Sequence, residues 1–111
     1  MRIITVRRLK EFWAEPIHRD SEEALRSWIR ILKRSGWRTP TEIKTTFGKR
    51  VDFVVARRTR NTLAVFDIAG NKYRLVAAVH YLSKVPEKGR VYVLRAMTHR
   101  EYDRERWKDE L

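Results

Sequence analysis

The stretch that decides the fold runs from Val65 to Asp103. It begins V-F-D-I-A-G-N-K-Y-R-L-V-A-A-V-H-Y at residues 65–81 and resumes V-Y-V-L-R-A-M-T-H-R-E-Y-D at residues 91–103. Two alternating apolar runs meet at Gly70-Asn71, a pair suited to a type II′ hairpin turn. The pattern therefore predicts an antiparallel meander whose strands cover residues 63–68, 72–82 and 90–97.

Helical patterns dominate the residues before this meander. The predicted elements are a short strand at 3–6 and helices over 7–15, from a cap at Asp20 or Ser21 to Gly36, and over 41–47. In the second helix one apolar stripe is formed by Leu25, Trp28, Ile29 and Leu32. A strand at 51–56 and a basic turn at 57–61 follow.

The residues after the meander predict a last helix. Thr98 and Glu101 have the spacing of a capping box, so a helix is expected from His99 towards Leu111. Helices followed by a run of strands favour an α+β fold over a wound parallel sheet. A length of 111 residues predicts one domain, residues 1–111, with N-terminal helices on a small, mainly antiparallel sheet.

Composition points to a polyanionic partner. The chain has 42% apolar residues, no cysteine and a formal net charge of +12. Residues 1–98 hold 22 Lys/Arg against 9 Asp/Glu, whereas residues 99–111 hold 4 against 5. Such a field favours nucleic acid first, since the scattered charge fits a membrane surface less well. An acidic protein partner stays open, and the absence of cysteine and of a long apolar run favours the cytoplasm.

Four side chains of the meander have the chemistry of a metal-free ribonuclease. Cleaving RNA in this way needs a base for the 2′-hydroxyl, an acid for the leaving oxygen and cations for the phosphorane. Lys72, Arg74, His99 and Tyr102 supply those groups. Arg74 stands in an otherwise apolar strand, where it is either ion-paired with Asp67 across the hairpin or a phosphate clamp. These two interpretations are equally favoured.

The other candidates have ordinary alternatives. His99 and Tyr102 lie three residues apart at a helix start, where an exposed His and a core-facing Tyr are common. No metal site and no cofactor are expected, because the three histidines lack ligand spacing. A basic helix face and the basic turn are candidate RNA contacts, unless they are only solvated surfaces; the residues are Arg26, Arg30, Lys33, Arg57, Arg58 and Arg60. Trp107 is a candidate docking anchor.

The motifs G-N-K-Y-R-L-V at 70–76 and T-H-R-E-Y-D at 98–103 together resemble the HigB family of toxins in the RelE superfamily. The likeness extends through the N-terminal half, including Phe12-Trp13, Leu25, Trp28 and Thr39-Pro40. Two features depart from the family pattern, a long loop at Lys84–Arg90 and the very basic segment Arg57–Arg60.

The resemblance implies a RelE-like fold and a ribosome-dependent mRNA endonuclease of a type II toxin–antitoxin system. Its partners would be mRNA on the ribosome and a HigA-like helix-turn-helix antitoxin, with which a hetero-tetramer is one expected assembly. Carried over by position, Lys72, Arg74, His99 and Tyr102 become site residues, and Asn71 becomes a turn former and RNA contact. A non-catalytic RNA-binding module, or a toxin-like protein that only binds its antitoxin, remain the alternatives.

Overall fold

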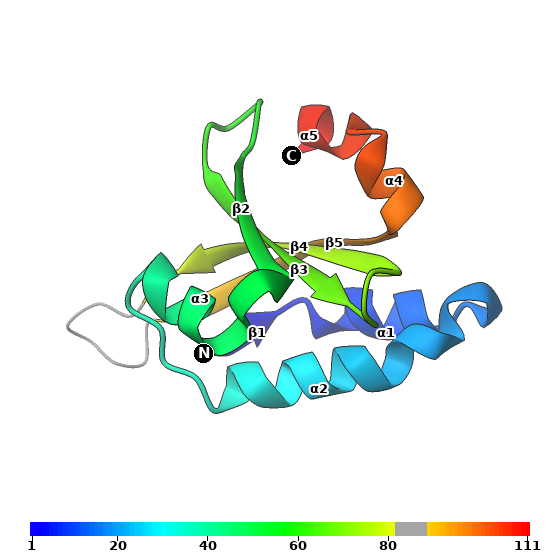
Figure 1. The fold of residues 1–111 in the computed structure, drawn as a ribbon, viewed down its shortest axis with the longest axis horizontal. Coiled ribbons are helices and arrows are strands. Elements are labelled where there is room, and N and C mark those ends of the chain that lie inside the picture. Colours follow the sequence, from blue (N-terminus) through cyan, green and yellow to red (C-terminus); the bar gives the residue numbers. More distant parts are fainter. Residues whose placement is uncertain (82–88) are drawn as a thin grey trace.

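The computed structural model describes residues 1–81 and 89–111 of the chain. The elements (Figure 1) are β1 (Arg2–Ile4), α1 (Val6–Ala14), the 3₁₀ helix η1 (Pro16–Ser21), α2 (Glu22–Lys33), α3 (Pro40–Phe47), the 3₁₀ helix η2 (Gly48–Arg50), β2 (Val51–Val55), β3 (Thr62–Ile68), β4 (Tyr73–His80), β5 (Arg90–Thr98), α4 (His99–Asp103) and α5 (Arg106–Glu110).

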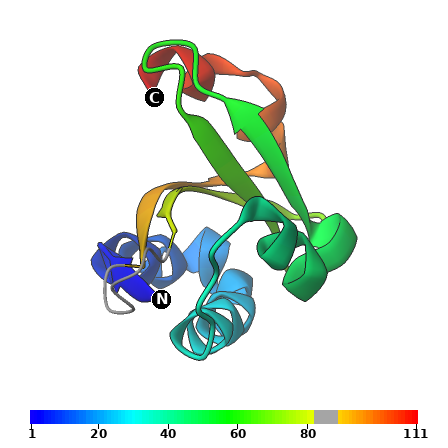
Figure 2. The same ribbon diagram turned by 90° about the vertical axis from the view of Figure 1, so that its left-hand side faces the viewer.

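The strands form one five-stranded sheet in the order β1-β5-β4-β3-β2. β1 pairs with β5 in parallel, and the other three pairs are antiparallel. Helices α1, α2 and α3 lie on one side of the sheet, whereas α4 and α5 lie on the other (Figures 1 and 2). The α+β prediction, with a mainly antiparallel sheet, is thus confirmed.

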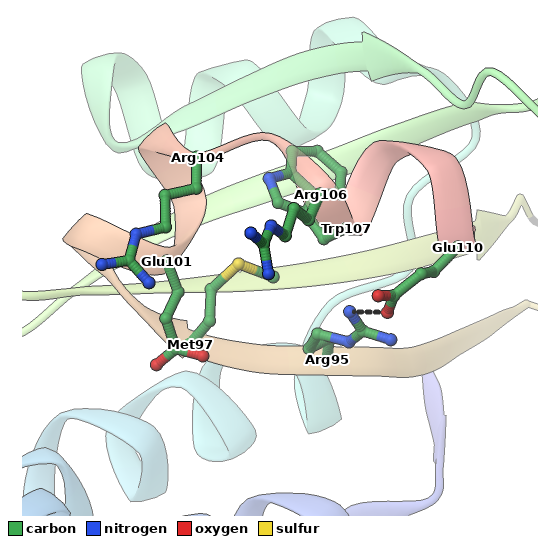
Figure 3. Close-up of a pocket in the computed structure, with 7 residues that line it drawn as sticks. All are labelled: Arg95, Met97, Glu101, Arg104, Arg106, Trp107 and Glu110. Carbon is green, nitrogen blue, oxygen red and sulfur yellow. Dashed lines mark ion pairs between the residues drawn. The ribbon is translucent and has the colours of Figure 1, made fainter.

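The face under α4 and α5 carries the smaller of two apolar cores. Trp107 is 2% exposed and packs with Val65, Val76 and Met97, so it docks on this domain. Figure 3 shows Trp107 and Met97 between α5 and the sheet. Its indole Nε1 donates to the carbonyl oxygen of Tyr102 at 3.0 Å, which satisfies the buried N–H. The lone tryptophan of an otherwise polar C-terminal segment thereby fixes that segment to the sheet.

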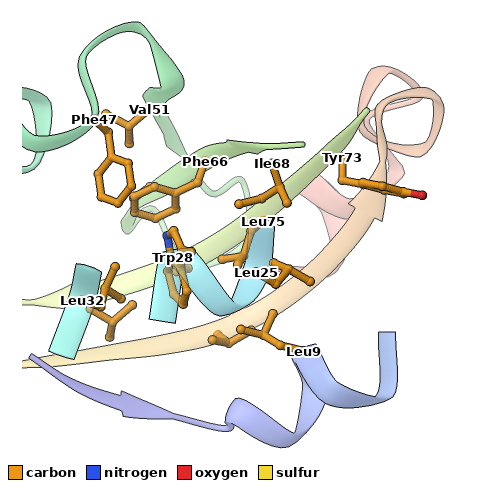
Figure 4. Close-up of a cluster of buried hydrophobic side chains, with 14 of the residues drawn as sticks. Leu9, Leu25, Trp28, Leu32, Phe47, Val51, Phe66, Ile68, Tyr73 and Leu75 are labelled. Carbon is orange, nitrogen blue, oxygen red and sulfur yellow. The ribbon is translucent and has the colours of Figure 1, made fainter. Parts of the chain in front are cut away.

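The opposite face carries the main core (Figure 4). Phe66 contacts Trp28 and Phe47 edge-on, with ring centroids 5.4 and 4.9 Å apart. The apolar stripe predicted for the second helix is the stripe that α2 buries here, since Leu25, Trp28 and Leu32 are each at most 2% exposed. Alternation along the strands therefore divides their residues between two cores, as the period of two requires.

Two local predictions are wrong. The hairpin closes at the Ile68–Tyr73 pair, so its loop has four residues rather than the two-residue Gly70-Asn71 turn. The positive φ of Gly70 (68°) and the Lys72 N–H donating to the Ala69 carbonyl at 3.4 Å fit a turn centred on Gly70-Asn71, but Ala69 also takes a positive φ (53°), which a type II′ turn does not have. The C-terminal helix is also two helices, because Glu105 takes a left-handed φ of 61° between α4 and α5.

Other bounds shift by a few residues. α2 begins after a 3₁₀ turn, and Ser21 makes no side-chain cap but donates its hydroxyl to the His18 carbonyl. The capping box of Thr98 and Glu101 is confirmed. The predicted strand end at Leu82 and most of the Lys84–Arg90 loop lie outside the described residues. Within the described ranges, every helix is too short or too polar to cross a bilayer.

Candidate active site

Arg74 is the centre of the polar contacts on the α4/α5 side of the sheet. It pairs in register with Asp67 on β3, and its Nε lies 3.2 Å from the Asp67 carboxylate. One terminal nitrogen donates to the Tyr73 and Asn71 carbonyl oxygens at 3.1 and 3.4 Å, and the other donates to the Asn71 side chain. Only 9% of the side chain is exposed. Of the two interpretations left open by the sequence, the ion pair with Asp67 is the one observed.

The Arg74 guanidinium also lies over the ring of Tyr102, 5.6 Å from its centroid. The Tyr102 ring in turn stacks on Trp107, with centroids 5.2 Å apart and planes 19° from parallel. Arg74 on β4, Tyr102 on α4 and Trp107 on α5 therefore form one stack against the sheet. Cation–π contact at this distance fixes the ring while its hydroxyl stays available.

The surroundings of Tyr102 keep its hydroxyl protonated. Burial is the main cause of its raised pKa, and the negative charge of Asp52 adds to it, while the positive charge of Arg74 opposes the shift. A tyrosine with a raised pKa is a proton donor rather than a base at neutral pH. The geometry thus suits Tyr102 for donating to an oxygen that gains negative charge.

Lys72 is held on the other side of the sheet from Arg74. Its ammonium pairs with the Asp20 carboxylate, which also accepts from the Tyr73 hydroxyl. The hydrogen bond from Lys72, followed by that from Tyr73, lowers the pKa of Asp20. Burial, helped by Asp20, raises the pKa of Tyr73 to about 12. These contacts fasten the β3–β4 turn to η1, away from the Arg74–Tyr102 stack.

His99 lies beside that turn, and among the described residues its ring makes no hydrogen bond to Arg74 or Tyr102. Its backbone N–H donates to the Lys72 carbonyl oxygen at 2.9 Å, which joins α4 to the β3–β4 turn. The imidazole Nε2 lies 3.1 Å from the Asp103 carboxylate, and Nδ1 is buried without a hydrogen-bond partner. In this arrangement neither nitrogen is placed as a free base for a substrate.

The candidate RNA contacts divide into two separate surfaces. Arg26 pairs with Glu22 at 2.7 Å and lies 4.8 Å over the Trp13 ring, on the α1–α2 side with Arg30 and Lys33. The basic turn lies on the α5 side, where Arg57 contacts Asp109 at 3.0 Å and Glu105 at 3.3 Å. Arg58 and Arg60 of that turn are exposed.

Sequence reasoning missed several members of these clusters. Asp20 had been noticed only as a helix cap, and Trp107 only as an anchor, so their contacts with Tyr73 and Tyr102 were not foreseen. Three arginines near α5 were also missed: Arg95, Arg104 and Arg106. Pairing of distant segments brings them together, and no local spacing signals it. Among residues 1–81 and 89–111, no group of three acidic or histidine side chains is gathered to hold a metal ion.

Comparison with known proteins agrees with this architecture. Residues 21–105 match the family described as HigB_toxin, the RelE-like toxic component of a toxin-antitoxin system. The mRNA interferase HigB of Escherichia coli O6:H1 (strain CFT073) is 32% identical over 81 residues, covering 73% of this chain and 70% of that protein. Both matched regions are long enough to establish the family that the two sequence motifs resemble. The chain belongs to the HigB family of RelE-like toxic components of toxin–antitoxin systems.

Proposed function

We propose that this chain is an mRNA endonuclease that cleaves on the translating ribosome without a metal ion and so inhibits translation. The observation that carries the proposal is the Arg74–Tyr102 contact on a strongly basic member of a toxin family. The name of the Escherichia coli relative, mRNA interferase HigB, supports the same activity. A HigA-like antitoxin would neutralise the chain in the cytoplasm.

In the proposed reaction the 2′-hydroxyl oxygen of RNA attacks the adjacent phosphorus and the 5′-oxygen leaves. Tyr102 donates its proton to the leaving oxygen, a role that fits its raised pKa. Arg74 acts as a positioning residue, since its donors are occupied by Asp67, Asn71 and Tyr73 and it contacts the Tyr102 ring. Its positive charge also favours the developing phosphorane at short range.

The remaining candidates have lesser parts in this proposal. Lys72 attracts the RNA backbone once a phosphate replaces Asp20, with which it now pairs. His99 serves as base only after its ring turns away from Asp103. Asn71 holds the turn through Arg74 and offers its exposed edge to RNA. The proposal therefore assigns the acid more firmly than the base.

A second candidate function has its own support. Arg74 and Lys72 are both ion-paired, and His99 faces Asp103, so the site has no open acid–base pair. A basic module that binds RNA or the ribosome without cutting it would need only exposed charge. The two functions differ in whether mRNA is broken.

Tyr102→Phe is the sharpest test, because it removes one hydroxyl and keeps the ring between Arg74 and Trp107. We expect mRNA cleavage in translating extracts and growth arrest in cells to be lost with the thermal stability unchanged. Tyr92→Phe, on β5 beside His80, is the matched control and should stay active. Intact mRNA in cells expressing the wild-type chain would contradict the enzyme and favour the binding module.

The ends of the RNA fragments test the metal-free chemistry. Attack by the 2′-hydroxyl leaves a cyclic or 3′-phosphate and a 5′-hydroxyl, and a 2′-deoxy substitution at the cut site blocks it. Fragments with 5′-phosphates would contradict this route. Equal cutting of naked mRNA and of mRNA on ribosomes would contradict ribosome dependence.

A further inference from the structure

Acidic side chains of the C-terminal segment contact basic side chains of β5 and of the β2–β3 turn. Arg57, from the β2–β3 turn, contacts Glu105 and Asp109, and Arg95, from β5, is ion-paired with Glu110. The acidic segment at residues 99–111 therefore lies against these arginines. It neutralises arginines on the same side of the sheet as Tyr102.

The Arg95–Glu110 pair borders a hollow of about 220 Å³ between β5 and the α4–α5 segment (Figure 3). Three of its lining side chains are arginines: Arg95, Arg104 and Arg106. Its two acidic side chains differ in what they do. Glu101 is used by the capping box of Thr98, whereas Glu110 contacts Arg95.

The arginines of this hollow are not equally occupied. Within the described residues, neither Arg104 nor Arg106 has an ion-pair partner, and both are exposed. Arg95 and Glu110 are 36% and 56% exposed, so water competes with their pairing and the Coulomb attraction is weak. A multiply bonded phosphate is a better acceptor for arginine than one exposed carboxylate.

The floor of the hollow ties it to the candidate active site. Trp107 lines the hollow and also stacks on Tyr102. A bulge opposite Val76 and Ala77 leaves Leu94 unpaired on β5, directly before Arg95. Bulges redirect the side chains next to them, so this irregularity accompanies the placement of Arg95 beside α5.

We propose that the hollow between β5 and α5 is a phosphate-binding subsite for single-stranded RNA, in which an RNA phosphate replaces Glu110 on Arg95 and is held by Arg104 and Arg106. Glu110 is then a built-in competitor that the RNA must displace. This inference rests on the proposed function for the identity of the ligand. It concerns binding next to Tyr102, and it leaves the chemistry of cleavage unchanged.

The test is equilibrium binding of a 2′-O-methyl RNA oligonucleotide, which cannot be cleaved by the proposed route, to the full chain. Arg104→Gln combined with Arg106→Gln should weaken binding at least about tenfold, and the salt dependence should become shallower. The matched control is Arg34→Gln combined with Arg38→Gln, which removes the same charge from exposed residues at the C-terminal end of α2 and just after it. It should weaken binding less.

Glu110→Gln should change RNA affinity in the opposite direction, which makes it the decisive variant. Removal of the competitor should tighten binding up to about fivefold, whereas Glu23→Gln, an equal charge change on the α2 face, should tighten it less. Unchanged or weaker binding by Glu110→Gln would overturn the proposal, as would a larger loss in the Arg34/Arg38 control than in the Arg104/Arg106 variant. Thermal unfolding of each variant identifies any that fails to fold.

The two proposals fail in different ways. If the wild-type chain binds the oligonucleotide with this pattern but cleaves no mRNA, the subsite stands and the enzyme proposal falls. If Tyr102→Phe abolishes cleavage while the Arg104/Arg106 variant binds like wild type, the subsite alone is refuted.

Discussion

The two faces of the sheet are built on different principles. The face under α1, α2 and α3 is covered by large apolar side chains, including Trp28, Phe66 and Leu75, and has an aromatic network. The face under α4 and α5 has a smaller core, and its covering segment is also held by exposed ion pairs. Most of the apolar burial that stabilises the fold is thus on the first face. On the second face, exposed ion pairs that a charged ligand could replace also hold the covering segment.

This difference suits a protein that must stay folded while a charged ligand comes and goes. Apolar contacts are not screened by salt, whereas exposed ion pairs are weak and are screened. A ligand that displaces an ion pair of α5 therefore costs little of the folding free energy. We therefore expect mutations in the main core to change the free energy of unfolding most, and mutations of the α5 ion pairs to change RNA binding most.

The largest contrast should come from neighbouring residues of β3 that face opposite sides. Phe66→Ala should lower the free energy of unfolding by about 3–5 kcal/mol, because Trp28 and Phe47 lose their edge contacts around a cavity. Val65→Ala, on the α4/α5 face, should cost about 1–3 kcal/mol. Urea unfolding measures both, and an equal cost for the two would contradict the unequal division of stability.

The Arg74–Asp67 pair is the exception on the second face, since its Arg74 side chain is buried and its Asp67 side chain is half-buried. Asp67→Asn should cost about 2 kcal/mol, because the Arg74 guanidinium loses its carboxylate at 9% exposure. Asp52→Asn, an exposed carboxylate on β2, is the control and should change stability little. A cost below that of the control would mean that Arg74 is held chiefly by Asn71.

The division between faces was readable from the sequence, because strand alternation and the α2 stripe are local patterns. Tyr73 and Leu75 face one core and Val76 the other, as a period of two predicts. The break at Glu105 was not readable. A left-handed residue interrupts a helix there because docking of Trp107 on the sheet outweighs helix continuation.

The sequence predicted which residues belong to the candidate site better than it predicted where they lie relative to one another. The four residues Arg74, Tyr102, Lys72 and His99 lie in one segment of the sequence. In the structure Arg74 contacts Tyr102 on one side of the sheet, whereas Lys72 contacts Asp20 on the other. Lys72 lies in the turn and contacts Asp20, a partner 52 residues away in the chain. The hairpin register was predicted correctly, since Asp67 pairs with Arg74. The contact between Lys72 and Asp20 depends instead on the packing of η1 against the β3–β4 turn, which no local pattern signals.

The hydroxyl of Tyr73 should give the helical face a pH dependence. The folded pKa of Tyr73 is raised to about 12, above the ordinary 10, so its contribution is complete below pH 10 and lost as pH rises through 12. Tyr73→Phe should remove this alkaline loss in urea unfolding measured across pH. An alkaline loss of the same size in the variant would assign it to other groups.

At low pH the dependence of stability on pH has the opposite sign, because a lowered pKa is involved. Lys72, followed by Tyr73, lowers the folded pKa of Asp20 below 3.8, so its contribution is present above that pH and lost as pH falls through the folded value. Asp20→Asn should flatten this acid limb. The control is Asp103→Asn, on α4, which should leave the limb in place.

The smallest effect is expected from the ion pairs of α5. Asp109→Asn breaks a contact with Arg57 whose two side chains are 53% and 68% exposed, so the free energy of unfolding should hardly change. Glu22→Gln removes a comparably exposed contact with Arg26 from the helical face and should change it as little. The exposed ion pairs of both faces would then contribute equally little to folding, which leaves Trp107 as the residue that keeps α5 on the sheet. A large loss of stability in Asp109→Asn alone would show instead that charge holds α5 in place, and an acid there would then be too costly for RNA to displace.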